Sequence, residues 1–179
     1  MLPAATLSVL LAFALGACGG SSNNVTAAKY VKSICTALGA WKSEVQNAGK
    51  KLQSSGAATA DPPAAKRDYV RFVSALRAAT EGAATALKKA GTPSVSNGKS
   101  IADGLTGAFS RGADGLVKAD SQAQAIPTSN ATVFEAGASA VTTQIRNSLQ
   151  GIATITPRNS AGLRTAAGRE PSCRVLSSS

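Results

Sequence analysis

Few side chains in this chain of 179 residues are suited to acid–base or metal chemistry. Histidine, the commonest general base and metal ligand, does not occur. No two of the nine acidic residues lie three or four positions apart, so no single helix presents two carboxylates on one face. These residues are Glu44, Asp61, Asp68, Glu81, Asp103, Asp114, Asp120, Glu135 and Glu170. We therefore expect no enzyme, no metal site and no cofactor, although a carboxylate pair contributed by two different helices stays open.

The N-terminal segment has the most specific motif. Residues 2–17 are apolar or small apart from one Thr and one Ser, a run shorter than the ~20 residues of a membrane-spanning helix and typical of a signal peptide. The run ends in Leu15-Gly16-Ala17-Cys18, and residues 19–24 are only Gly, Ser and Asn. The segment resembles a bacterial lipoprotein precursor, with these four residues as its lipobox. Because no Lys or Arg precedes Lys29, we expect the true start to lie upstream of Met1, unless the α-amino group alone supplies the positive charge.

This resemblance implies a membrane anchor. Cys18 would receive a thioether-linked diacylglycerol, and residues 1–17 would be removed as a signal peptide. Residues 18–25 would then be the lipidated cysteine and a flexible linker, and residues 26–179 the folded domain. Two or more acyl chains anchor a protein stably, which predicts a location on the outer face of the cytoplasmic membrane. The alternative is an ordinary secretory signal in which Cys18 has no role.

The chain has three cysteines. If Cys18 carries the lipid, Cys35 and Cys173 remain on the oxidising side of the membrane, where we expect them to form a disulfide. A bridge that closes most of the domain into one loop stabilises it by about 4–5 kcal/mol in a chain-entropy estimate. Free or intermolecular thiols are the alternative. Two thiols without histidine cannot form a structural zinc site.

Four stretches of the remaining chain have apolar residues at steps of three and four, as amphipathic helices do. These stripes run from Val31 to Leu52, Tyr69 to Ala90, Ile101 to Ala123 and Phe134 to Ile155. Thr26 and Asp61 are expected N-caps, Pro62 a first helical residue, and Thr132 with Glu135 a capping box; Gly91, Pro127 and Pro157 are expected to end helices. A further short helix is expected around residues 161–167. No alternating strand pattern occurs, so a sheet is not expected.

Helices of about 25 residues with short connections favour antiparallel neighbours. The sequence therefore predicts an all-α, up-down-up-down four-helix bundle whose C-terminal tail is tied to the first helix by the disulfide. Four glycines in the third helix favour close packing against a neighbour, or else a pliable element beside a binding site; they are Gly104, Gly107, Gly112 and Gly115. The fourth helix has Glu135 and Arg146 as its only charges, which indicates either the most enclosed helix or a weakly polar surface.

Charge gives one candidate binding surface. The net charge is +10, but export and the lack of aromatic residues among the cations argue against a nucleic-acid partner. The densest cations are Lys50, Lys51, Lys66, Arg67 and Arg71. In an up-down bundle they share one end. The favoured interpretation is a solvated basic face without a partner, and the alternative is a surface for an anionic cell-wall polymer or another partner. The positive charge also predicts attraction of the domain to anionic lipid. Surface pairs four residues apart are expected at Arg77–Glu81, Lys99–Asp103 and Asp114–Lys118.

The chain beyond the lipobox also carries a loose resemblance. The segment from Tyr30 to Cys35, with Trp41 six residues on, and the closing Pro171-Ser172-Cys173 are similar to small actinobacterial lipoproteins of uncharacterised function. We expect a non-enzymatic binding or scaffolding module of the cell envelope, held to the membrane by its lipid, with no nucleic-acid partner. The alternative is a small-ligand or lipid carrier with a pocket between helices.

Overall fold

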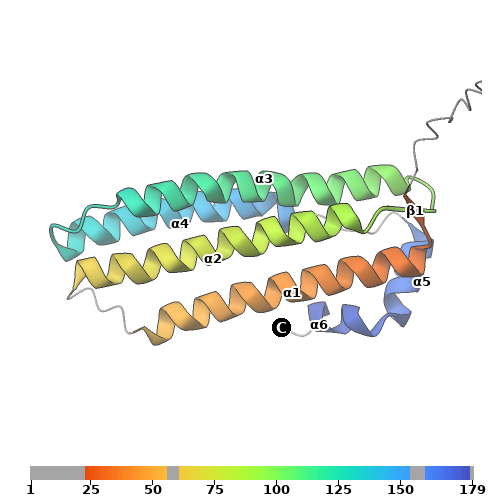
Figure 1. Cartoon of the computed structure of the whole chain (residues 1–179), viewed down its shortest axis with the longest axis horizontal. Helices are drawn as coiled ribbons and strands as arrows, with labels where there is room; N and C mark the ends of the chain where they lie inside the picture. Colours follow the sequence, from red (N-terminus) through yellow and green to blue (C-terminus); the bar gives the residue numbers. More distant parts are fainter. Residues whose placement is uncertain (1–22, 56–60, 154–159, 178–179) are drawn as a thin grey trace, which may run out of the picture.

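The computed structural model describes residues 23–55, 61–153 and 160–177. Its long helices are α1 (Ala27–Ser54), α2 (Pro62–Lys89), α3 (Gly98–Ala125) and α4 (Ala131–Ala153). The tail forms α5 (Ala161–Arg169), the 3₁₀ helix η1 (Pro171–Cys173) and α6 (Arg174–Ser177). Consecutive long helices run antiparallel, so the predicted up-down-up-down bundle is confirmed (Figure 1). Helices α2 and α3 form the central pair, α4 packs on α3, and α1 lies between α2 and the tail.

Local capping signals set most of the helix boundaries. The Thr26 side chain accepts a hydrogen bond from the backbone N–H of Lys29, and Asp61 does the same for Ala64 ahead of Pro62. Gly91 has φ +80° just after α2, where a side chain would be strained. The predicted starts of α1 and α2 and the end of α2 are therefore confirmed.

The predicted capping box of the fourth helix is wrong. Helix α4 begins at Ala131, and the Asn130 side chain accepts a hydrogen bond of 3.0 Å from the backbone N–H of Val133. Asparagine is as good an N-cap as threonine, and it comes two residues before Thr132, so the helix starts earlier. Ile155 and Pro157 lie outside the described residues.

A short parallel strand pair also departs from the expectation of no sheet. Strand β1 (Asn24–Val25) pairs with β2 (Thr92–Pro93), which directly precedes α3 in the α2–α3 connection. The Thr92 N–H donates to the Asn23 carbonyl at 2.9 Å, and the Ser94 N–H donates to the Val25 carbonyl at 2.8 Å. Residues 24 and 25, assigned from sequence to the linker, thus hold the start of the domain against the α2–α3 connection. Two residues are too few to leave an alternating pattern in the sequence.

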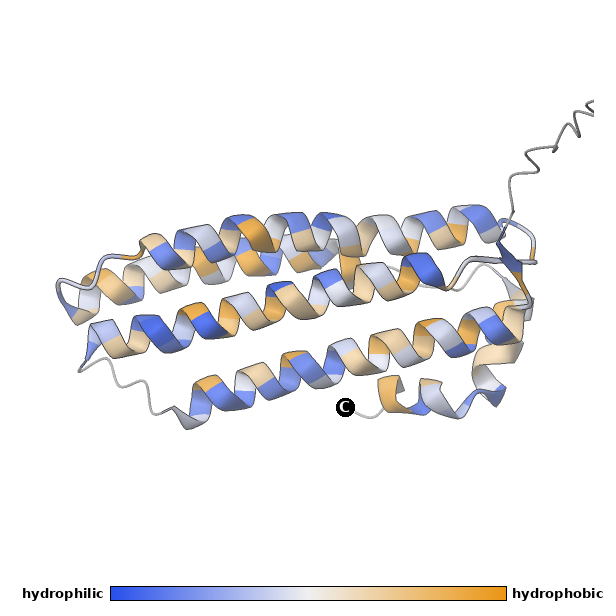
Figure 2. Cartoon of the chain, viewed as in Figure 1, coloured by the Kyte–Doolittle hydropathy of each residue, from blue (hydrophilic) through white to orange (hydrophobic). Residues whose placement is uncertain are grey.

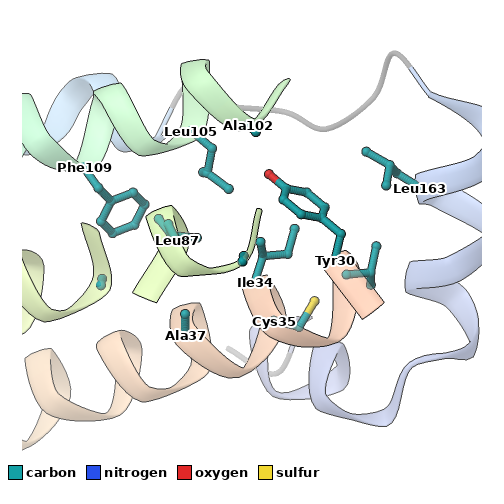
Figure 3. Close-up of a cluster of buried hydrophobic side chains, with 12 residues drawn as sticks. Tyr30, Ile34, Cys35, Ala37, Leu87, Ala102, Leu105, Phe109 and Leu163 are labelled. Atoms are coloured by element: carbon teal, nitrogen blue, oxygen red, sulfur yellow. The ribbon is translucent and has the colours of Figure 1, made fainter. Parts of the chain in front are cut away.

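The buried apolar residues form two separate clusters along the bundle. The cystine core joins the N-terminal halves of α1 and α3 to the C-terminal half of α2 and to Leu163 of α5 (Figure 3). The α4 core joins the N-terminal half of α2, the C-terminal half of α3 and α4. Hydrophobic and hydrophilic residues are mixed along the whole length of each long helix (Figure 2). Helix α1 therefore contributes its fully buried cluster residues to one core and α4 to the other.

Polar contacts lie in the middle third of α2, between these cores. The Trp41 indole N–H donates to the Thr80 hydroxyl at 3.1 Å, and the Trp41 ring meets Phe109 edge-on at 5.3 Å. On the other side of α2, the Arg77 guanidinium lies 3.1 Å from the Asp120 carboxylate, which also accepts from the Ser74 hydroxyl at 2.7 Å. These bonds fix the rotation of α2 against α1 and α3.

The α3–α4 contact depends on two of the four glycines. A Cβ on Gly115 would come within 2.6 Å of the Ser148 Cβ, and one on Gly112 within 2.9 Å of the Ile152 Cδ1. A Cβ on Gly104 would meet nothing within 4 Å, and one on Gly107 would meet only the Arg111 side chain. Close packing thus accounts for Gly112 and Gly115 and not for the other two.

The surface of α4 resolves the alternative left open by its sequence. Its buried side chains are Phe134, Val141 and Ile145, while most of its Ser, Thr, Asn and Gln residues are exposed. Helix α4 is therefore not the most enclosed helix, and it presents a weakly polar surface.

Candidate functional site

The candidate basic residues gather at the end of the bundle where α1 meets α2. Lys50 and Lys51 lie in the last turns of α1, and Lys66, Arg67 and Arg71 lie in the first three turns of α2. All are exposed except Lys66, which is half-buried. We call these five residues the basic tip. It lies at the opposite end of α1 from β1, and hydrophilic residues mark the start of α2 there (Figures 1 and 2).

Helix electrostatics explains only part of the basic tip. Lys51 sits in the last turn of α1, where a cation interacts favourably with the partial negative charge of the helix C-terminus. Lys66 and Arg67 sit near the N-terminus of α2, where cations are unfavourable, and the first turn of α2 has no acidic residue. The charges of Lys66 and Arg67 therefore do not serve the stability of their own helix.

Two members of the basic tip border one hollow between α1 and α2. This hollow has a volume of about 140 Å³, with Leu52 and Phe72 among its apolar lining residues and Lys51 and Arg71 among its polar ones. Asp68 also lines it and lies 3.2 Å from the Arg71 guanidinium. Lys50, Lys66 and Arg67 lie outside the hollow, so the structure brings Lys51 and Arg71 together and leaves the other three around them. A cationic rim over an apolar floor suits an anionic group attached to an apolar body.

The described acidic residues do not form a reacting pair. Asp120, the one that is buried, is held by Arg77 and Ser74 between α2 and α3. Sequence reasoning missed this contact, although Asp120 stands four residues after Leu116 on the buried stripe of α3, a position that requires a cation from a facing helix. The contact is structural because Arg77 and Ser74 together hold the Asp120 carboxylate. Among the described residues, the buried Arg77 Nε has no hydrogen-bond partner.

Surface ion pairs follow the sequence predictions in two cases out of three. Arg77 and Glu81 lie 3.7 Å apart, and Lys99 pairs with Asp103. Asp114 and Lys118 are both exposed and form no ion pair within 4.0 Å, so this prediction is wrong. An exposed ion pair is little more stable than its two charges solvated by water. A spacing of four residues is therefore not enough to determine whether the pair forms.

The two cores each contain one buried tyrosine with a perturbed acidity. Burial raises the pKa of the Tyr30 hydroxyl to about 12. Burial also raises the pKa of Tyr69, and a hydrogen bond of 2.8 Å with the Thr142 hydroxyl partly offsets this rise. Both phenols therefore stay protonated at neutral pH, and neither supplies a base.

The predicted disulfide is present. Cys35 of α1 and Cys173 of η1 are bonded, with their Cα atoms 4.9 Å apart and 138 residues apart in sequence. It ties the tail to α1, as expected. Cys18, the signal peptide and the lipobox lie outside the described residues.

The described residues contain neither a metal-binding group nor a membrane-spanning helix. Within residues 23–55, 61–153 and 160–177, no three His, Cys, Asp or Glu side chains are grouped so that they could hold a metal ion. Across the same ranges, no helix combines the length and the apolar character needed to span a membrane.

Comparisons with known proteins add no assignment. No protein family, no curated protein and no solved structure matches the chain.

Proposed function

We propose that this chain is a lipid-anchored lipoprotein on the outer face of the cytoplasmic membrane and acts there as a non-enzymatic binding or scaffolding module. In this proposal Cys18 carries the anchor, residues 1–17 are a signal peptide, and the basic tip binds an anionic cell-wall polymer. The observation that carries the proposal is the placement of the basic tip at the end of α1 opposite β1.

Geometry supports a reach away from the membrane. Helix α1 has 28 residues and is about 42 Å long at about 1.5 Å per residue. Only four residues separate Cys18 from Asn23, which is hydrogen-bonded at the β1 end. If α1 stands upright on the membrane, the basic tip lies several Debye lengths of about 8 Å from the lipid surface. A polymer that passes above the membrane is then a better match for the tip than the lipid itself.

The chemistry of the chain supports binding rather than catalysis. The sequence has no histidine, and the buried carboxylate of Asp120 is used in a structural contact. A disulfide fits an oxidising compartment, which agrees with export.

The anchor is tested by Cys18→Ala in the full chain expressed in a bacterium with lipoprotein processing. In phase partition with a clouding detergent, the wild type should enter the detergent phase and Cys18→Ala should stay in the aqueous phase. Cys35→Ala with Cys173→Ala is the matched control, because it removes two cysteines and their disulfide but leaves partition unchanged. Equal partition of the wild type and Cys18→Ala would refute the anchor.

The basic tip is tested by removing four charges at once. The variant Lys50→Gln, Lys51→Gln, Lys66→Gln and Arg67→Gln should bind isolated cell walls about tenfold more weakly at physiological salt, because each exposed contact contributes about 0.2–1 kcal/mol. A matched control removes the same number of exposed cations at the other end of α1 and α2, at Lys29, Lys32, Lys88 and Lys89. Equal losses in the two variants would point to net charge and contradict a localised site.

A further inference from the structure

A second cavity lies at the other end of the bundle, between α1 and the C-terminal tail. It has a volume of about 180 Å³ and is lined by Val31 and Ile34 of α1, Leu163 and Ala167 of α5, and Leu176 of α6. We call it the tail cavity. Figure 3 shows Ile34 and Leu163 on the two elements that form its walls. Arg164 is its one charged lining residue, and this side chain is exposed.

The walls of the tail cavity are fixed in place. Cys35 lines the cavity and is bonded to Cys173, so the tail cannot close over the space by sliding along α1. The Lys42 ammonium donates to the Val175 carbonyl at 3.0 Å, and Leu163 is buried in the cystine core. A cavity whose walls are held in this way keeps its shape without a guest.

Size and polarity define the guest. An engineered apolar cavity of about 150 Å³ takes benzene, so the tail cavity has room for about six or seven carbon atoms. Because its lining is apolar apart from Arg164, the buried part of the guest must be aliphatic or aromatic.

Charge defines the exposed part of the guest. Residues 160–177 contain three arginines and one glutamate. The carboxylate of that glutamate, Glu170, accepts hydrogen bonds from the Ser172 N–H at 3.2 Å and from the Ser172 hydroxyl at 2.9 Å. With three arginines and one glutamate, the segment that carries Arg164 has a net positive charge, and a guest with a negative head is favoured there.

We propose that the tail cavity binds a medium-chain fatty acid of about eight carbons, with its aliphatic chain between α1 and α5 and its carboxylate at the Arg164 guanidinium. This site is separate from the basic tip and does not rest on the function proposed for it.

Chain length gives the first test. The full chain carrying Cys18→Ala, purified without detergent, is titrated calorimetrically with butanoate, hexanoate, octanoate and decanoate, each below its micelle concentration. Affinity should rise about fourfold per added methylene until the cavity is filled, and then level off near eight carbons. An affinity that rises without a plateau indicates adsorption on the surface, and it overturns the proposal, as does the absence of saturable binding.

Two substitutions locate the guest. Ala167→Phe fills the cavity and should weaken octanoate binding at least tenfold, whereas Thr165→Phe on the exposed face of the same helix should leave it within twofold. Arg164→Gln should weaken the binding of octanoate but not of octanol. Circular dichroism confirms that each variant is folded. Unchanged octanoate binding in Ala167→Phe would place the guest elsewhere and overturn the proposal.

Discussion

The two cores of this bundle are closed by different means. The cystine core is closed by α1 and a short tail, and a covalent bond holds that tail. The α4 core is closed by a helix of 23 residues that packs through Phe134, Val141 and Ile145 and through close contact with the glycines of α3. A tail of three short helices buries little apolar surface by itself and needs a cross-link, whereas a long helix supplies enough packing without one.

The largest expected effect comes from removing the disulfide, which only the cystine core has. Replacing Cys35 and Cys173 together by alanine should lower the free energy of unfolding by about 4–5 kcal/mol, because the 138-residue loop is no longer closed in the unfolded chain. Urea unfolding followed by circular dichroism measures the loss. If the cores differ as described, proteolysis of this variant should begin in the tail, and first cuts in α4 would contradict the comparison.

A smaller effect distinguishes the two buried tyrosines by pH. The folded protein keeps the Tyr30 proton up to a pKa of about 12, while the unfolded chain releases it near 10. The stability that this phenol contributes is therefore complete below pH 10 and is lost as the pH rises toward 12, by about 2–3 kcal/mol. Tyr30→Phe has no phenol to titrate and should not lose this contribution. The difference in the free energy of unfolding between the wild type and Tyr30→Phe, measured by urea unfolding, should therefore change between pH 10 and 12.

Tyr69→Phe is the comparison in the α4 core. It removes the hydrogen bonds to the Ala138 carbonyl at 3.0 Å and to Thr142, so its cost of about 1 kcal/mol should already be present at pH 7. A wild-type protein whose stability changes between pH 10 and 12 no more than that of Tyr30→Phe would disprove the pKa assigned to Tyr30.

Two glycine substitutions on α3 test the packing argument for α4. Gly115→Ala should destabilise the protein by about 1–3 kcal/mol, because its Cβ meets Ser148 on α4. Gly104→Ala, on the same helix with free space around it, should stabilise by up to about 1 kcal/mol. The midpoints of urea unfolding should therefore shift in opposite directions. Stabilisation by both substitutions would show that helix propensity, and not contact with α4, dominates at Gly115.

Local signals made most of the fold predictable from sequence. Thr26, Asp61 with Pro62, and Gly91 each act through their own backbone neighbours, so a single sequence was enough to place three helix boundaries. Thr132 failed because Asn130 has the same capping chemistry and precedes it. The disulfide was predictable because a lipid on Cys18 would leave only two cysteines, and these lie at the two ends of the domain.

Contacts that depend on the rotation and register of two helices were not predictable. Arg77 and Asp120 meet only because α2 and α3 have one particular rotation, which apolar periodicity does not specify to within one residue. The division into two cores was missed for the same reason, since a stripe shows which face is buried and not which helix covers it. For the candidate site, the shared end of the basic residues followed from the up-down order, whereas the pairing of Lys51 with Arg71 around one hollow required the structure.

The β1–β2 pair has a mechanical consequence. A force applied to the chain before Asn23 acts first on the Thr92–Asn23 and Ser94–Val25 hydrogen bonds. Only after these bonds break does it unwind the first turn of α1. Tension is thereby passed directly to the connection between the two central helices, so a force on the leading end loads α2 and α3 before it unwinds α1.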